Sequence, residues 1–524
     1  MASSVFITFN GQSCESQQGE SMLDALVRAG VALSAPCGGR GICGKCRLTL
    51  LKGKVRLLKN GAEVKHAEVK TGDSFCACRA TALSDVIVSL PDDAADFSAS
   101  SLADMQTGKE HLHAGKTGRA GIGIDIGTTT VQAQIVDLDT GEVLQTFSAL
   151  NSQRSFGADV MSRIGAAREG KTRELFTAIN SQIEEILRQC ISNWNLSCIE
   201  QCAVSGNTTM LHLFAGVDPS AIGEAPYTPV FLEERHFEGR ELSLSARHIT
   251  LLPGISAFVG ADIVSGLALI DIMNRNEDSL FADIGTNGEI AVWKNSEKRL
   301  LCSSTAAGPC FEGAEITCGM GAEAGAINRI SFKKETQSTD WFQSGTLCNT
   351  TLFYTTLDNV KARGICGAGL IDAISVMKKL DVIDETGALA DKYAPDGFPI
   401  TEGIFITQRD VRQFQLAKAA IFSGIKILCK TAGLEPENVD TAYIAGGLGF
   451  FINLENAENI GLISGGLAKK AAVCGNTSLK GAVKCLTDSS FLSRCREIIS
   501  HSGAVDLALN GDFSETFMEN ICFF

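Results

Sequence analysis

Three cysteines in a glycine-rich loop constrain the first hundred residues of this chain more than any other feature. Cys37, Cys43 and Cys46 follow the spacing C-x5-C-x2-C, with four glycines between them. A [2Fe–2S] cluster needs four thiolates that converge on two irons. Glycines allow the backbone to turn its N–H groups toward the anionic sulfurs of such a cluster. The loop therefore predicts an iron–sulfur site.

The fourth thiolate must come from another segment, and Cys76 and Cys78 are the candidates. We favour Cys78, because the run Cys76-Ala77-Cys78 resembles the Leu-Ala-Cys run that carries the fourth ligand in plant- or adrenodoxin-like ferredoxins. Zinc is the alternative, since four cysteines also bind zinc tetrahedrally. Zinc sites usually pair two C-x2-C knuckles, however, and only one is present here, so the cluster is the favoured interpretation.

Apolar periodicity divides the chain into three parts. Alternating apolar residues on either side of one helical pattern (22–29), with Asn10-Gly11 as a hairpin turn, predict a small α+β domain of the β-grasp type over residues 1–93. Residues 94–119 are polar without apolar periodicity, which predicts a flexible linker. Residues 120–524 alternate short apolar strands with amphipathic helices, the clearest over 408–432, which predicts an α/β domain.

Composition excludes several kinds of partner. The net charge of −14 argues against nonspecific binding to nucleic acid and against an anionic membrane surface. The 19 cysteines, without a visible signal peptide or a long apolar stretch, predict a cytoplasmic protein with reduced thiols and no transmembrane helix. Most cysteines after Cys78, such as Cys190, Cys310 and Cys429, are expected to be small buried core residues.

Two similar turns, 125–130 and 283–289, each connect two apolar strands. Both offer backbone N–H groups and hydroxyls to phosphate oxygens, and both begin with an aspartate that can hold Mg²⁺, usually through water. A third, glycine-rich turn over 444–449 would let backbone lie close to a nucleoside. Any one of these is equally well an ordinary turn. Together and in this order, the three turns predict a site in which ATP is bound between two facing turns.

The order of the turns resembles the acetate and sugar kinase, Hsc70 and actin superfamily, in which two ribonuclease-H-like halves clamp ATP–Mg²⁺. The whole chain further resembles the reductive activators of corrinoid proteins, which couple an N-terminal [2Fe–2S] domain to such an ATPase. The runs that carry this resemblance are 151–153, 156–164, 205–212, 259–262, 306–313 and 364–369.

The resemblance implies an ATP-hydrolysing electron-transfer enzyme. Its cofactors would be a [2Fe–2S] cluster, ATP and Mg²⁺. Its partner would be a corrinoid methyl-carrier protein, which it returns from inactive cob(II)alamin to cob(I)alamin with an electron from an external low-potential donor; a homodimer is left open. The alternatives are an ATP-dependent activator of another low-potential enzyme and a nucleotide-switched redox sensor.

The same resemblance assigns roles within the ATP site. Asp125 and Asp283 are the expected magnesium ligands, and Asp262 and Glu289 are the candidates for a general base, although either is equally well a cap or turn residue. Asn207 and Glu312 could likewise be cap residues. The residues expected to contact phosphates are Thr128, Thr129, Thr286 and Asn287, those expected near adenosine are Gly446, Gly447 and Gly449, and the other expected nucleotide-binding positions are Gly127, Thr130, Asn207, Gly285, Gly288 and Gly308.

Two features depart from the family pattern. Cys310 stands where the family usually has alanine, and we interpret it as a small core residue. The segment between the cluster domain and the ATPase is short, whereas larger members insert an extra linker and a middle domain. We therefore do not assume a dimer built by such a middle domain.

Overall fold

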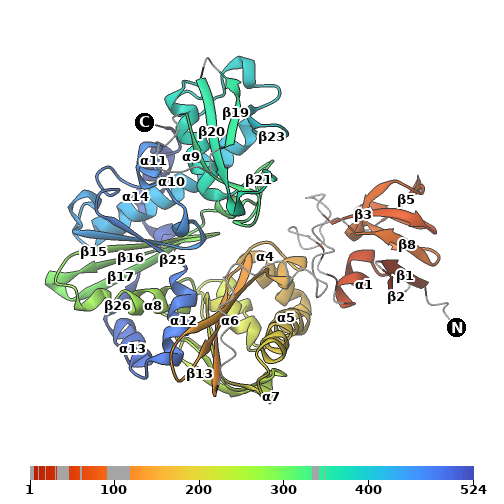
Figure 1. Ribbon diagram of the computed structural model, residues 1–524, viewed down its shortest axis with the longest axis horizontal. Coiled ribbons are helices and arrows are strands. Elements are labelled where there is room, and N and C mark those ends of the chain that lie inside the picture. The colour runs from red at the N-terminus through yellow and green to blue at the C-terminus, as the bar shows by residue number, and fades with distance from the viewer. Residues whose placement is uncertain are drawn as a thin grey trace. The chain divides into compact units, whose positions relative to one another are not determined.

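The computed structural model describes residues 5–9, 11–17, 19–29, 31, 33, 46–59, 62–90, 118–332, 342–347 and 350–523. The chain divides into two units, Met1–Leu252 with Ala482–Ser489, and Pro253–Gly481 with Ser490–Phe524. Figure 1 labels their helices and strands. The predicted linker, 94–119, lies almost wholly outside the described residues.

The N-terminal part of the first unit is the predicted β-grasp domain. A mixed sheet has the strand order β2-β1-β8-β3-β6, and α1 contributes the buried Met22 and Leu26 to its core. The predicted hairpin joins β1 to β2 through Gly11, whose φ of 77° favours glycine. A second sheet has the order β5-β4-β7. The bounds are β1 (Val5–Phe9), β2 (Gln12–Ser16), α1 (Met22–Arg28), β3 (Arg47–Lys52), β4 (Val55–Lys59), β5 (Ala62–Glu68), β6 (Ser74–Cys76), β7 (Ala80–Ala82) and β8 (Val86–Ser89).

The rest of the first unit is built on a six-stranded sheet with the order β11-β10-β9-β12-β14-β13. The first three strands form an antiparallel meander, after which β12 runs parallel to β9 and β14 parallel to β12. The bounds are β9 (Ala120–Ile126), β10 (Thr130–Asp137), β11 (Val143–Leu150), α4 (Val160–Ala166), α5 (Thr172–Asn193), β12 (Ile199–Gly206), α6 (Thr208–Phe214), β13 (Arg235–Glu238), α7 (Gly239–Leu242) and β14 (Ala246–Leu251).

The second unit repeats this topology in the sheet β25-β24-β15-β16-β17-β26. Here β15, β16 and β17 form the meander, while β24 runs parallel to β15 and β25 parallel to β24. Apart from β13 and β26, which extend the edges, both sheets have the order third, second, first, fourth, fifth. Two such sheets are the two ribonuclease-H-like halves that the sequence predicts. The bounds are β15 (Ser279–Ile284), β16 (Gly288–Lys294), β17 (Arg299–Thr305), β24 (Thr441–Ala445), β25 (Ala471–Gly475) and β26 (Ser502–Ala504).

Helices and two smaller sheets complete the second unit. The predicted long helix is α10, and its capping box is confirmed: Thr407 Oγ1 accepts the N–H of Asp410, whose carboxylate accepts the N–H of Thr407. The bounds are α8 (Ala261–Leu269), β18 (Ala326–Ser331), β19 (Phe342–Leu347), β20 (Thr350–Thr356), β21 (Gly364–Ile365), α9 (Gly367–Lys379), β22 (Phe398–Thr401), β23 (Ile404–Ile406), α10 (Gln408–Thr431), α11 (Leu454–Asn459), α12 (Thr477–Thr487), α13 (Phe491–His501) and α14 (Gly511–Glu519).

Most of the scattered cysteines are core residues, as predicted: of the twelve described after Cys78, seven are buried and five are partly exposed. Cys190, Cys310 and Cys429 are at most 3% exposed, and burial raises the pKa of each thiol. Cys310 therefore fills a small apolar position, as its interpretation required. In the described parts of the chain, no helix combines the length and the apolar content that crossing a membrane requires.

Candidate functional site

Two of the predicted cluster ligands lie in contact. Cys46 directly precedes β3, and Cys78 lies in a short 3₁₀ turn, η1 (Ala77–Arg79). Their Sγ atoms are 3.3 Å apart, and the N–H of Ala77 donates to the Cys46 carbonyl at 2.7 Å. The contact with Cys78 lowers the pKa of the Cys46 thiol and outweighs the opposing effect of burial. Two adjacent cysteine sulfurs, one of which has a lowered pKa and so forms a thiolate more readily, are suited to bind a single metal cluster.

The remaining ligand candidates are placed differently. Cys76 ends β6 opposite Arg47 of β3 and is the N-cap residue of the turn η1 that carries Cys78. Cys37 and Cys43 lie outside the described residues. The geometry of the described pair therefore supports Cys78 over Cys76 as the fourth ligand, and the full set of four stays a prediction.

The first predicted phosphate turn joins β9 to β10, and the N–H of Gly127 donates to the Thr130 carbonyl at 3.0 Å. Three polar side chains from distant segments hold this turn. Asn151 Nδ2 donates to the Gly127 carbonyl at 2.8 Å, and Asn207 Nδ2 donates to Thr128 Oγ1 at 3.1 Å. The guanidinium of Arg163 donates to the Thr128 carbonyl. Such bonds fix the turn geometry that phosphate recognition needs.

Asn207 is a cap residue, which was one of its two expected roles, and its contact with nucleotide stays a prediction. Its Oδ1 accepts the N–H of Met210, which makes it the N-cap of α6. Its amide nitrogen meanwhile reaches the turn, so one side chain ties the start of a helix to the hydroxyl of Thr128. Asp125 lies in β9 between Gln132 of β10 and Ser205 of β12, close to the same turn in sequence.

Asn151 and Arg163 were missed as site residues, although each lies in a run that carries the family resemblance. Asn151 and Arg163 are both completely buried, and Arg163 also donates to the Gly157 carbonyl at 3.1 Å. A fully buried guanidinium is uncommon, because removing its charge from water is costly unless hydrogen bonds compensate. An arginine within a run of mostly small or apolar residues was the available signal.

Arg163→Met is expected to weaken ATP binding by about tenfold, because the Thr128 carbonyl loses a charge-assisted donor behind the phosphate turn. Calorimetric titration with ATP and Mg²⁺ measures the change. Arg168→Met is the matched control, since Arg168 lies nearby in sequence but is largely exposed and pairs with Glu224. Equal ATP affinity in both variants would show that Arg163 has no influence on the turn.

The second predicted turn joins β15 to β16, and the N–H of Gly285 donates to the Asn287 carbonyl at 2.9 Å. Asp283 and Glu289 stand directly opposite each other on these strands. The third turn is adjacent, because a Cβ built on Gly446 would lie 2.6 Å from Asp283 Oδ1. Gly446 has a φ of 95°, and Gly447 and Gly449 follow in a 3₁₀ turn, η11 (Gly447–Phe450). Only glycine allows this close approach of the turn to the aspartate.

Three carboxylates gather beside the second turn. Burial raises the pKa of Glu289 well above its ordinary value, and the charges of Asp262, in the first turn of α8, and Asp283 raise it further. Ser304 Oγ donates to Glu289 Oε1 at 3.3 Å. Asp262 and Glu289 therefore share one acidic environment, and the choice between them as a general base stays a prediction.

These carboxylates do not form a complete metal site by themselves. Within the described ranges, no group of three or more His, Cys, Asp or Glu side chains converges closely enough to hold a metal ion. A magnesium ion here would therefore need phosphate oxygens and water to complete its coordination, as Mg²⁺ commonly does.

Two predicted glycines have other local explanations or contacts. A Cβ on Gly288 would lie 2.0 Å from Ile421 Cδ1, so packing of α10 on β16 alone accounts for this glycine. Gly308 has a φ of 83° and begins the 3₁₀ turn η7 (Pro309–Glu312). Its contact with nucleotide stays a prediction. The first turn belongs to the first unit and the other two to the second, and their joint grip on one ATP also stays a prediction.

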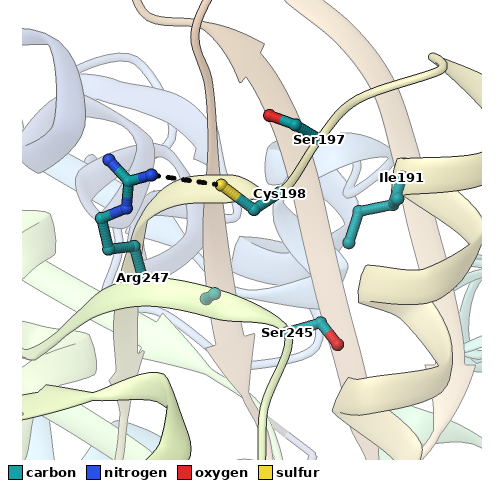
Figure 2. A pocket seen from close by; sticks show the side chains of 6 residues that line it. Ile191, Ser197, Cys198, Ser245 and Arg247 are labelled. Atoms are coloured by element: carbon teal, nitrogen blue, oxygen red, sulfur yellow. Dashed lines mark hydrogen bonds between the residues drawn. The ribbon is translucent and has the colours of Figure 1, made fainter.

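A cavity of about 450 Å³ lies elsewhere in the first unit and is lined by Ile191, Ser197, Cys198, Ser245, Ala246 and Arg247 (Figure 2). Figure 2 shows the guanidinium of Arg247 turned toward the sulfur of Cys198, and Arg247 also pairs with Glu200 at 3.0 Å. Its residues precede or begin β12 and β14, whereas the phosphate turn follows the opposite end of the parallel strand β9. This cavity is therefore separate from the nucleotide turns.

Family comparisons agree with this arrangement of domains. A 2Fe-2S iron-sulfur cluster binding domain matches residues 5–83, the RACo middle region matches 120–275, and the C-terminal domain of RACo, the ASKHA domain, matches 277–524. The middle-region match corrects our expectation that this region is missing, because it coincides with the first ribonuclease-H-like half.

Relatives extend the similarity over most of the chain. The corrinoid activation enzyme RamQ of Eubacterium limosum is 32% identical over 434 residues, which cover 77% of this chain and 70% of RamQ. The [Co(II) methylated amine-specific corrinoid protein] reductase of Methanosarcina barkeri is 30% identical over 430 residues, 76% of this chain and 75% of that protein. A solved reductive activator for corrinoid, iron-sulfur protein is 27% identical, with a TM-score of 0.71 over 99% of this chain and 98% of that one.

The fold and the turns thus define an iron–sulfur protein in which a [2Fe–2S] domain is joined to an ATP-binding ASKHA domain. Within that class, the chain belongs to the family of reductive activators of corrinoid proteins.

Proposed function

We propose that this protein is an ATP-dependent reductive activator that returns a corrinoid methyl-carrier protein from cob(II)alamin to cob(I)alamin. One observation carries the proposal: a single chain joins a ferredoxin domain with a contacting Cys46–Cys78 pair to a domain with three nucleotide-type turns. Both relatives named above are described as acting on corrinoid proteins, and each aligns with about three quarters of this chain.

The cluster would supply one low-potential electron, at about −400 mV for a plant-type centre. Within the chain, Cys46 and Cys78 are proposed to hold it, together with Cys37 and Cys43. An electron donor from outside the chain must then reduce it. Transfer to a resting cob(II) centre requires a change in the cobalt environment, and the nucleotide site can provide the free energy for that change.

ATP can provide that free energy through differences in affinity. If the nucleotide-bound form grips the cob(II) partner more tightly than the free form, binding energy can alter cobalt ligation, and hydrolysis can release the product. A ligand shifts such an equilibrium only by its difference in affinity between the two states. The proposed roles are magnesium binding by Asp125 and Asp283, phosphate contacts by the first two turns, and activation of water by Asp262 or Glu289.

The cellular setting follows from the thiols. No disulfide joins the cysteines of the described residues, which together with an iron–sulfur cluster favours a reducing compartment. We propose a cytoplasmic protein that meets its corrinoid partner there. A homodimer is a further arrangement to be tested, and a measurement of the mass of the protein in solution tests it.

The test is direct reduction of a corrinoid partner. The purified protein, mixed with a cob(II) methyl-carrier protein, a strong chemical reductant and ATP with Mg²⁺, is expected to produce the cob(I) absorption band. Omission of ATP should reduce the rate by an order of magnitude or more, because the uphill transfer then lacks its free-energy source. ATP turnover without cob(I), across several corrinoid proteins, would favour another low-potential target. Nucleotide binding without turnover would favour a redox sensor.

A further inference from the structure

The carboxylate of Glu312 lies on the second phosphate turn. Thr286 Oγ1 donates a hydrogen bond to Glu312 Oε2 at 2.5 Å. On the neighbouring residue, a Cβ built on Gly285 would lie 3.5 Å from Glu312 Oε1. One carboxylate thus covers two consecutive turn residues that the sequence predicts as phosphate contacts. Thr286 is only 7% exposed, so its hydroxyl has little access to water.

The protein holds Glu312 in this position through a rigid support. Glu312 ends η7, and the preceding Cys310 and Phe311 are both 3% exposed in the core of the second unit. Gly313 follows with a φ of 80°, and a Cβ there would lie 2.2 Å from the Met320 carbonyl. The carboxylate therefore extends from a short turn that is anchored on both sides, so its place on the phosphate turn is built into the fold.

This contact conflicts with phosphate binding. A threonine hydroxyl can donate one hydrogen bond, and in this structure the carboxylate of Glu312 accepts it. A phosphate oxygen that binds Thr286 as expected needs the same hydrogen bond, and it carries the same sign of charge as the carboxylate. Hydrogen bonds to ionised acceptors are roughly twice as strong as neutral ones, so Glu312 is a strong competitor.

We propose that Glu312 is a built-in competitor for a phosphate group of ATP at the second turn. In the nucleotide-free protein its carboxylate accepts the hydrogen bond from the hydroxyl of Thr286. ATP binding displaces the carboxylate, and the Thr286–Glu312 bond forms again when the phosphate leaves, which favours release. The inference deepens the proposed function and rests on ATP binding at this turn.

The experiment measures ATP affinity calorimetrically, once with Mg²⁺ and once with a chelator. Glu312→Gln is expected to bind ATP about tenfold more tightly than the unaltered protein in both conditions, and Glu312→Ala at least as tightly. Glu315→Gln is the matched control, because Glu315 lies in the same loop but is exposed, and its affinity should not change. Melting temperatures verify that each variant is folded.

A double-mutant comparison isolates the shared hydroxyl. In a Thr286→Val background, the gain from Glu312→Gln should largely disappear, because no proton is left to compete for. Weaker Mg²⁺-dependent binding by Glu312→Gln would instead make Glu312 a metal ligand and overturn the inference. Unchanged affinity, a gain equal to that of Glu315→Gln, or a gain that survives Thr286→Val would also overturn it.

The outcomes for the two proposals are distinguishable. If the unaltered protein binds no ATP, the proposed function fails together with the competition. If the affinity changes appear as expected while no corrinoid protein is reduced, the reductive function fails and the competition at the second turn stands.

Discussion

Cys78→Ser is expected to abolish the visible absorption of the iron–sulfur cluster and to lower the iron content from about two per chain to near zero. Cys78 is the cysteine whose sulfur lies in contact with that of Cys46, and serine cannot replace a soft thiolate on iron. Iron and acid-labile sulfide assays together with the visible spectrum measure the loss. Cob(I) formation in the activation assay should disappear with it.

Cys76→Ser is the matched control, since Cys76 lies two residues away and ends a strand. This variant should keep its cluster and its activity. The opposite pattern, an essential Cys76 with a dispensable Cys78, would show that the fourth ligand is assigned wrongly. Stoichiometric zinc without sulfide in the unaltered protein would instead point to the tetrahedral zinc alternative.

Gly446→Ala is expected to weaken ATP binding by about thirtyfold or more. The added methyl would lie 2.6 Å from both Asp283 Oδ1 and the Ile284 carbonyl, at a residue with a φ of 95°. Backbone strain of this kind costs about 1–3 kcal/mol, and each 1.4 kcal/mol is a factor of ten in affinity. The third turn would move away from the aspartate or the aspartate would rotate. Titration with ATP and Mg²⁺ measures the loss.

Gly465→Ala provides the control for this substitution. Gly465 is in the same unit, is exposed, and has open space where its Cβ would be, so ATP affinity should not change. Unfolding measurements on both variants separate a local change at the turn from a general loss of stability. Unchanged ATP affinity in folded Gly446→Ala would remove the third turn from the nucleotide site.

Much of the fold could be predicted because its signals are local. Alternation and turn residues predicted the strands beside each phosphate turn, and Thr407 with Asp410 predicted the start of α10. The preference for Cys78 depended on a resemblance that the Cys46 contact now supports. These signals are carried by residues close together in the chain.

The supports of the phosphate turns could not be predicted in the same way. Asn151 and Arg163 act on backbone carbonyls some 24 and 35 residues away in sequence, and no local pattern encodes such pairs. Glu312 reaches Thr286 across 26 residues for the same reason. Side chains that stabilise a turn from outside become visible only when tertiary packing brings their segments together.

The repeated strand order of the two ribonuclease-H-like sheets indicates an internal duplication whose copies have diverged in electrical character. In the copy that begins at β9, side-chain amides and the Arg163 guanidinium donate hydrogen bonds to the turn. In the copy that begins at β15, the side chains around the turn are the carboxylates of Asp262, Asp283, Glu289 and Glu312. Each half thus has one aspartate beside its turn, Asp125 or Asp283, but the second half places further carboxylates around it. If the two halves are expressed separately, the first should still bind free nucleotide weakly. The second should bind nucleotide only in the presence of a divalent ion.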